Sequence, residues 1–149
     1  GINQDCDASV DESAALDGFE PNNSSSAAYY MAGNNTNVYL YADFQYLTDN
    51  SDWFWINTVD DTNFICDDFN IQVWLESQPT GVDYDIYLYN ASLTLLASSG
   101  ASGNANEQIN WSPGCNSWGD DGGVYYVRVE RYSGWDCSDT YYLQVLNSD

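Results

Sequence analysis

The chain has 149 residues, of which 44% are hydrophobic, and this is enough for one domain with a single core. Its 23 acidic residues far outnumber the two basic ones, Arg128 and Arg131, and the net charge is -21 at pH 7. This charge repels phosphate backbones and anionic lipid headgroups, which argues against nucleic-acid binding and membrane insertion and favours cations as ligands.

The composition also argues against an enzyme. The sequence contains no His and no Lys, which removes the commonest general base and the amine that forms Schiff bases. A pair of carboxylates, as glycosidases use, is the catalytic alternative that so many acidic residues leave open. We therefore expect a protein that binds its ligand without transforming it.

The first part of the chain is expected to be irregular. Residues 1–16 lack hydrophobic periodicity and contain Cys6, so we expect an N-terminal extended arm, with residues 17–149 forming a single domain. Residues 17–24 are rich in Gly, Pro and Asn, which is typical of turns. Residues 24–31 are expected to form either one helical turn or a short strand.

Most of the remaining chain alternates between apolar and polar residues, and this period of two is typical of strands with one buried face. Residues 82–90 are the clearest example, because Val, Tyr, Ile and Leu at even positions alternate with Asp and Tyr at odd positions. Further strands are expected at residues 38–44, 53–59, 69–76, 93–98, 107–111, 125–130 and 141–145. About eight short strands with turns between them predict an all-β fold, a two-sheet antiparallel β-sandwich of jelly-roll type.

The four cysteines are widely spaced and form no C-x-x-C pair: Cys6, Cys66, Cys115 and Cys137. A zinc site favours closer spacing and usually His, so we expect disulfides in a secreted protein. Four cysteines allow three connectivities. If successive strands alternate in direction, the parity of the loops favours the pairs Cys66–Cys115 and Cys6–Cys137.

Two acidic turns offer oxygen ligands for a cation. One is Glu-Pro-Asn-Asn at residues 20–23, and the other is Asp-Asn-Ser-Asp at residues 49–52. Ca²⁺ takes about six to eight oxygen ligands from carboxylates, amides, backbone carbonyls and water, and such turns present them at short spacing. The alternative is that both are ordinary solvated turns.

Several motifs together resemble the bacterial pre-peptidase C-terminal domain. They are the turn at 20–23 with Ala27, Asp52-Trp53-Phe54, the strand at 83–89, Glu107-Gln108-Ile109, the segment 123–129 and Tyr142-Leu143-Gln144-Val145. The family includes the collagen-binding modules of clostridial collagenases and consists of secreted, non-catalytic jelly-roll sandwiches appended to exoenzymes. The resemblance implies a calcium site with ligands from Glu20, Asn22, Asn23, Asp49 and Asp52.

A set of aromatic residues occupies the strand positions opposite to the aliphatic ones: Tyr39, Tyr41, Trp74, Tyr87, Tyr89, Tyr126 and Tyr142. In a two-sheet sandwich these positions face solvent, and we expect them to form a face that meets a ligand or partner. Such a face can bind an extracellular polymer, pack against a neighbouring domain or join copies of the chain. The alternative is that the domain's own loops and arm cover it.

Together these features predict a secreted, extracellular or cell-surface module that binds Ca²⁺ and takes part in adhesion or in targeting a substrate. The expected partner is a polysaccharide or a fibrous protein. The alternative function is a self-assembling structural subunit of an extracellular fibre or surface layer, for which the partner is another copy of the chain.

Overall fold

The computed structural model describes residues 17–44, 49–59, 70–114, 122–136 and 139–148. The expected N-terminal arm and all four cysteines lie outside these ranges. The arm and the disulfide pairs Cys66–Cys115 and Cys6–Cys137 therefore stay predictions.

Nine strands and one short 3-10 helix make up the described part of the chain. The helix η1 spans Ser25–Ala27 and is followed directly by β1, so the segment expected to be a turn of helix or a strand contains both. The strands are β1 Tyr29–Ala32, β2 Asn37–Ala42, β3 Ser51–Thr58, β4 Asn70–Glu76, β5 Asp83–Asn90, β6 Leu95–Ser99, β7 Glu107–Trp111, β8 Gly123–Ser133 and β9 Tyr141–Ser148.

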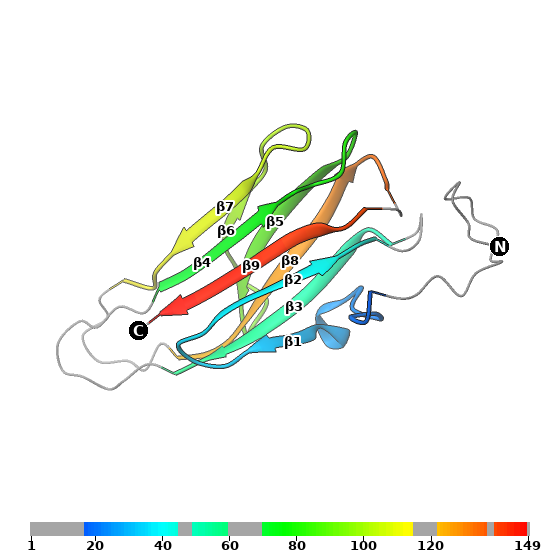
Figure 1. The fold of residues 1–149 in the computed structure, drawn as a ribbon. Coiled ribbons are helices and arrows are strands. Elements are labelled where there is room, and N and C mark those ends of the chain that lie inside the picture. The colour runs from blue at the N-terminus through cyan, green and yellow to red at the C-terminus, as the bar shows by residue number, and fades with distance from the viewer. Residues whose placement is uncertain (1–16, 45–48, 60–69, 115–121, 137–138, 149) are drawn as a thin grey trace.

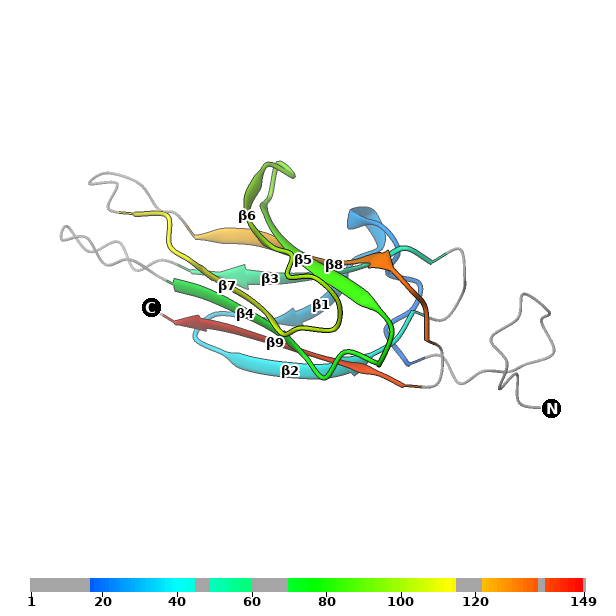
Figure 2. The ribbon, with the colours of Figure 1, turned by 90° about the horizontal axis from the view of Figure 1, so that it is seen from above.

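The strands form two stacked sheets (Figures 1 and 2). One sheet has five strands in the order β1-β3-β8-β5-β6, and the other has four in the order β2-β9-β4-β7. This arrangement confirms the predicted two-sheet β-sandwich. The pairing of β1 with β3 is parallel, whereas the other strand pairs are antiparallel.

The hydrophobic core fills the space between the sheets, as the alternating pattern predicted. In β5, for example, Tyr84, Ile86 and Leu88 are buried while the residues between them are partly exposed. The other strands contribute residues of the same kind, including Phe54, Val73, Val127 and Leu143. Within the described residues, no helix has the length and apolar character needed to cross a membrane.

The start of β3 differs from the sequence-based expectation. Residues 49–52 were expected to form a turn, but β3 already begins at Ser51, so Asp52 is a strand residue whose side chain points into the sandwich. Because β1 runs parallel to β3, the chain preceding β1 reaches the same end of the sandwich as the chain preceding β3. This topology brings two acidic segments together that are separated by about thirty residues in the sequence.

Candidate metal centre

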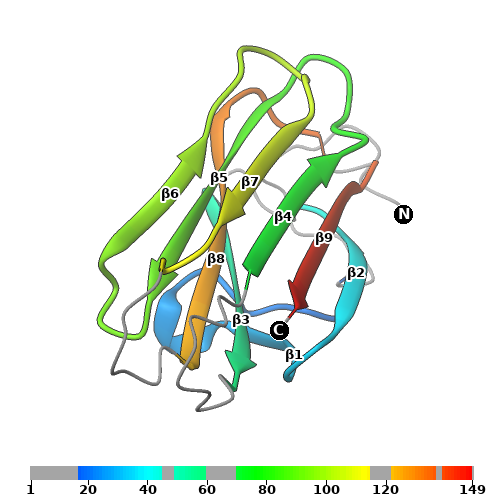
Figure 3. The same ribbon diagram turned by 90° about the vertical axis from the view of Figure 1, so that its left-hand side faces the viewer.

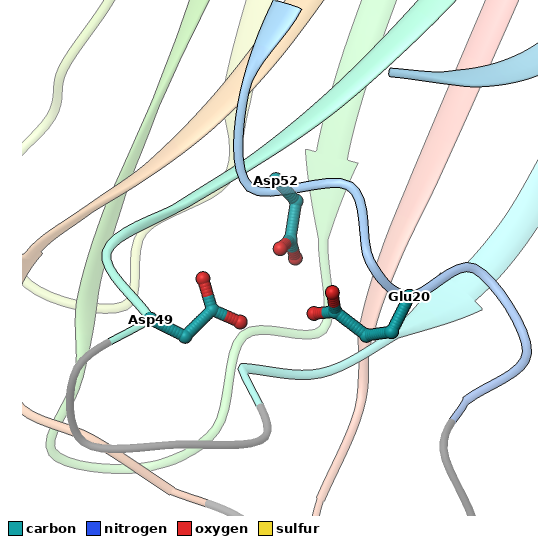
Figure 4. Close-up of side chains that lie close together, drawn as sticks. All are labelled: Glu20, Asp49 and Asp52. Carbon is teal, nitrogen blue, oxygen red and sulfur yellow. The ribbon is translucent and has the colours of Figure 1, made fainter. Parts of the chain in front are cut away.

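Three carboxylates converge at this end of the sandwich. Glu20 comes from the turn before η1, Asp49 lies just before β3, and Asp52 belongs to β3. Their ligand oxygens lie within 4.8 Å of one another, and Figure 4 shows the three side chains pointing toward a common centre. The structure thus brings together three residues that the family resemblance implied as metal ligands.

Backbone hydrogen bonds hold the two acidic segments side by side. The Trp53 N–H donates to the carbonyl of Asn22 at 2.8 Å, which links the first turn to β3. The Asn22 N–H in turn donates to Oε2 of Glu20 at 3.0 Å, which orients that carboxylate. The parallel register continues from there, with Tyr29 opposite Phe54.

The centre is enclosed and its oxygens are poorly satisfied. Asn22 and Asp52 are 0% exposed, and Asp49 is 3% exposed. Within the described residues, Oε1 of Glu20, both carboxylate oxygens of Asp49, Oδ1 of Asp52 and both polar atoms of the Asn22 amide have no hydrogen-bond partner. Buried oxygens without a partner are rare in folded proteins, and a bound cation would satisfy them.

The two asparagines of the first turn differ in position. Asn22 is fully buried, its side-chain amide has no partner among the described residues, and its backbone N–H bonds to Glu20. Asn23 is exposed, so its side chain does not share the enclosed centre. The amide oxygen of Asn22 is therefore the better candidate ligand of the two.

The crowding of like charges makes ionisation of this centre unfavourable without a cation. Burial and the neighbouring Glu20 carboxyl raise the pKa of Asp49 to about 8. Burial and the charge of Asp49 raise the pKa of Asp52 well above its usual range, although a hydrogen bond from Tyr141 opposes this shift. Burial and the charges of Asp17 and Glu20 raise the pKa of Asp43 to about 6.

The donor set fits Ca²⁺. It consists of carboxylate oxygens and an amide oxygen, which are the ligands that this hard cation prefers. Arg131 acts in the same direction as a cation at Asp49, but its effect on that carboxyl is smaller than those of burial and Glu20. A glycosidase pair must reach its substrate, and Asp49 and Asp52 are too deeply buried to do so.

Sequence reasoning missed the polar residues that support the centre. The Tyr141 hydroxyl donates a hydrogen bond to Oδ2 of Asp52. The Asp17 carboxylate accepts from the N–H groups of Phe19 and Asp43, at 2.9 and 3.1 Å, and so ties the turn to the end of β2. A signal for Tyr141 was available, because it occupies an inward position of β9 and a buried Tyr hydroxyl needs a partner.

The aromatic residues expected on one surface lie on both sheets. Tyr39, Tyr41, Trp74 and Tyr142 belong to the four-stranded sheet, whereas Tyr87, Tyr89 and Tyr126 belong to the five-stranded sheet. The expectation of a single aromatic face is therefore wrong. Alternation distinguishes inward from outward positions, but it does not specify which sheet a strand joins.

On the five-stranded sheet the aromatic rings pack mainly against the domain itself. The Arg128 guanidinium lies 5.6 Å from the ring centroid of Trp53 and 5.5 Å from that of Tyr87, and it also pairs with Glu130 at 2.6 Å. Trp53 and Tyr89 stack with centroids 5.3 Å apart. These rings are only partly exposed, in contrast to Tyr39 and Tyr41 on the other sheet, which are 62% and 56% exposed.

A comparison with protein-family models gives no match for this chain, and a comparison with curated proteins gives none either. Among solved structures, the chain is similar to the pre-peptidase C-terminal domain of a collagenase from Bacillus anthracis. The two are 20% identical, the match covers 78% of this chain and 93% of that one, and the TM-score is 0.47. That structure is a domain of the kind that the sequence motifs resemble.

Proposed function

We propose that the chain is a secreted, non-catalytic β-sandwich module that binds Ca²⁺ and attaches to an extracellular polymer. The observation that carries the calcium part is the group of Glu20, Asp49 and Asp52, in which Oε1 of Glu20, both oxygens of Asp49 and Oδ1 of Asp52 are buried without a partner among the described residues. The exposed tyrosines of the four-stranded sheet support the attachment part. The sequence resemblance to pre-peptidase C-terminal domains supports both.

Calcium would stabilise the folded state because the folded protein assembles the ligands and the unfolded chain does not. At a free calcium concentration about one hundred times the dissociation constant, the expected gain is about 2.7 kcal/mol. For a domain of this size the gain raises the unfolding midpoint by roughly 5–10 °C. The test is thermal unfolding of the protein in a chelator and in calcium.

The variant Asp52→Asn makes this test specific. The amide keeps the shape of the side chain and cannot ionise at this crowded site, so the variant should fold in chelator at least as well as wild type. It should lose most of the stabilisation by calcium. Asp139→Asn is the matched control, because it removes the same charge at an exposed position, and it should respond to calcium as wild type does. An equal response of both variants would contradict the site.

The second candidate function is self-assembly, and the position of β2 favours it. This strand lies at the edge of the four-stranded sheet and reads Asn-Val-Tyr-Leu-Tyr-Ala, without a charge or proline to discourage pairing with another strand. Two of its outward residues, Tyr39 and Tyr41, are exposed. Sedimentation at increasing protein concentration distinguishes the two functions, because a subunit assembles whereas an attachment module stays monomeric.

A further inference from the structure

We infer that the outer face of the four-stranded sheet binds a neutral polysaccharide that runs across the strands. The inference rests on the proposed function and deepens its attachment part, because it names the class of polymer and the residues that hold it. The observation that supports it most directly is a row of four side chains in register across the sheet: Tyr39, Gln144, Trp74 and Gln108.

The strand pairings define this row. Tyr39 of β2 lies opposite Gln144 of β9, Gln144 lies opposite Trp74 of β4, and Trp74 lies opposite Gln108 of β7. All four occupy outward positions, since their strand neighbours Leu40, Leu143, Val73 and Ile109 are buried in the core. Figure 3 shows the four strands side by side in this order. Aromatic and amide side chains therefore alternate from one edge of the sheet to the other.

The spacing of the row suits a linear polymer. Neighbouring strands are about 4.8 Å apart, so Tyr39 and Trp74, two strands apart, are separated by roughly 9.6 Å. This is close to the length of two sugar units in an extended chain. The rings of Tyr39 and Trp74 can stack on the C–H faces of every second sugar unit. The Gln144 amide lies between the two rings and can hydrogen-bond to the hydroxyls of the intervening sugar unit.

The central amide of the row is held in place. Nε2 of Gln144 donates to Oδ1 of Asn37 at 2.7 Å, and its Oε1 accepts from the Tyr142 hydroxyl at 3.2 Å. The Tyr142 ring also stacks on Tyr39, with centroids 5.8 Å apart and an interplanar angle of 30°. Neighbours thus orient both Tyr39 and Gln144, which lowers the entropy lost when a ligand binds.

Charge selects the class of polymer. The chain as a whole carries a net charge of -21, which repels anionic polysaccharides. The row itself is uncharged, and the next row, Tyr41, Tyr142 and Glu76, contains a single carboxylate. A neutral polymer rich in hydroxyl groups therefore fits this face, since amides and rings recognise it without needing an opposite charge. The opposite sheet is less suitable, because Arg128 already lies over Trp53 and Tyr87.

The test measures binding of the calcium-loaded protein to insoluble cellulose, chitin and mannan, with alginate as an anionic polymer and fibrous collagen as a protein. Wild type should bind at least one of the neutral polysaccharides and should not bind alginate or collagen. Tyr39→Ala and Trp74→Ala should each weaken that binding about tenfold or more, as expected when an aromatic ring that stacks on the ligand is lost. Gln144→Ala should weaken it as well.

Two control variants remove aromatic rings elsewhere. Tyr132→Ala changes a residue that is 73% exposed and outside the row, and Trp55→Ala changes the opposite sheet. Both should bind the polysaccharide as wild type does. A calcium-dependent unfolding midpoint, measured for every variant, separates a lost contact from a lost fold. Soluble oligosaccharides of the bound polymer should gain affinity sharply once they are long enough to reach from Tyr39 to Trp74.

The other outcomes overturn the inference in distinguishable ways. Polysaccharide binding that survives loss of Tyr39 and Trp74 would overturn the site but leave the attachment function standing. Binding to collagen or alginate alone would overturn the ligand class. Absence of binding to every polymer would overturn both this inference and the attachment function, and stabilisation by calcium in the same samples would leave the metal centre intact.

Discussion

The hydroxyl of Tyr141 on β9 donates a hydrogen bond to the carboxylate of Asp52 on β3, and so joins the two sheets through a buried polar contact. Both side chains are 0% exposed. Tyr141 also packs against Phe44 and Tyr84 in the core, with ring centroids 5.8 and 6.0 Å away. The position of one carboxylate of the metal centre is therefore fixed by the hydrophobic core of the domain.

Replacing Tyr141 with Phe tests this link. The ring stays, but the buried Asp52 loses its donor, so the free energy of unfolding in chelator should fall by about 1–3 kcal/mol. Urea unfolding measures the change. Tyr132→Phe, at an exposed position, is the control and should stay within about 0.5 kcal/mol of wild type. Equal stability of Tyr141→Phe and wild type would show that the hydrogen bond contributes nothing.

The raised pKa of Asp49 predicts how stability depends on pH. This carboxyl has a pKa of about 8 in the folded protein and an ordinary value near 3.8 when unfolded, so between these values the folded state binds more protons. The free energy of unfolding of the metal-free protein should therefore decrease as pH rises from about 4 to about 8. The raised pKa of Asp43 acts in the same direction.

Calcium should reverse part of this trend, because it binds the ionised carboxylates and competes with protons. The gain in stability from calcium should be larger at pH 8 than at pH 5. Urea unfolding across this range, in chelator and in calcium, measures both trends. If the metal-free protein instead became more stable between pH 5 and pH 8, the raised pKa of the Asp49 carboxyl would be contradicted.

The two asparagines of the first turn provide a sharp comparison. Asn22→Ala should weaken calcium binding at least about tenfold, because a buried amide oxygen without a partner among the described residues is lost, whereas Asn23→Ala should have little effect. Calorimetric titration with calcium measures the affinities. Stronger impairment by Asn23→Ala would mean that the exposed residue supplies the ligand and that the buried amide serves another purpose.

Arg128 is expected to stabilise the aromatic cluster on the five-stranded sheet. Its guanidinium contacts the rings of Trp53 and Tyr87 and pairs with Glu130, so Arg128→Ala should lower the free energy of unfolding by about 1–2 kcal/mol. Arg128→Lys keeps the charge but not the planar group, and its loss should be smaller. Unfolding followed by tryptophan fluorescence measures both. If Arg128→Ala unfolds like wild type, these rings do not depend on the guanidinium.

The strands could be predicted because they depend on local pattern. The alternation around Ile86 or Leu143 requires one face to be buried, whatever the rest of the chain does. Which strands pair with one another, and in which sheet, could not be predicted in this way. Nothing near Tyr29 specifies that β1 pairs in parallel with β3, and nothing near Tyr87 places its strand in a different sheet from Tyr39.

The same distinction applies to the metal centre. The acidic turns and the family resemblance pointed to Glu20, Asp49 and Asp52, which the fold brings together. The difference between Asn22 and Asn23 could not be read from the sequence, because it depends on how the first turn docks on β3, where the Trp53 N–H bonds to the carbonyl of Asn22. The contact between Tyr141 and Asp52 depends on how the two sheets are stacked.

The parallel pairing of β1 with β3 has a mechanical consequence. A pulling force applied at Asp17 first meets the hydrogen bond from the Asp43 N–H to the Asp17 carboxylate. It then reaches Glu20 and the bond between Trp53 and Asn22, and only afterwards β1. A calcium ion bridging Glu20 to Asp49 and Asp52 would therefore bear load before the strand does. The calcium concentration around the protein would then set the tension at which residues 17–32 peel away from the sheet.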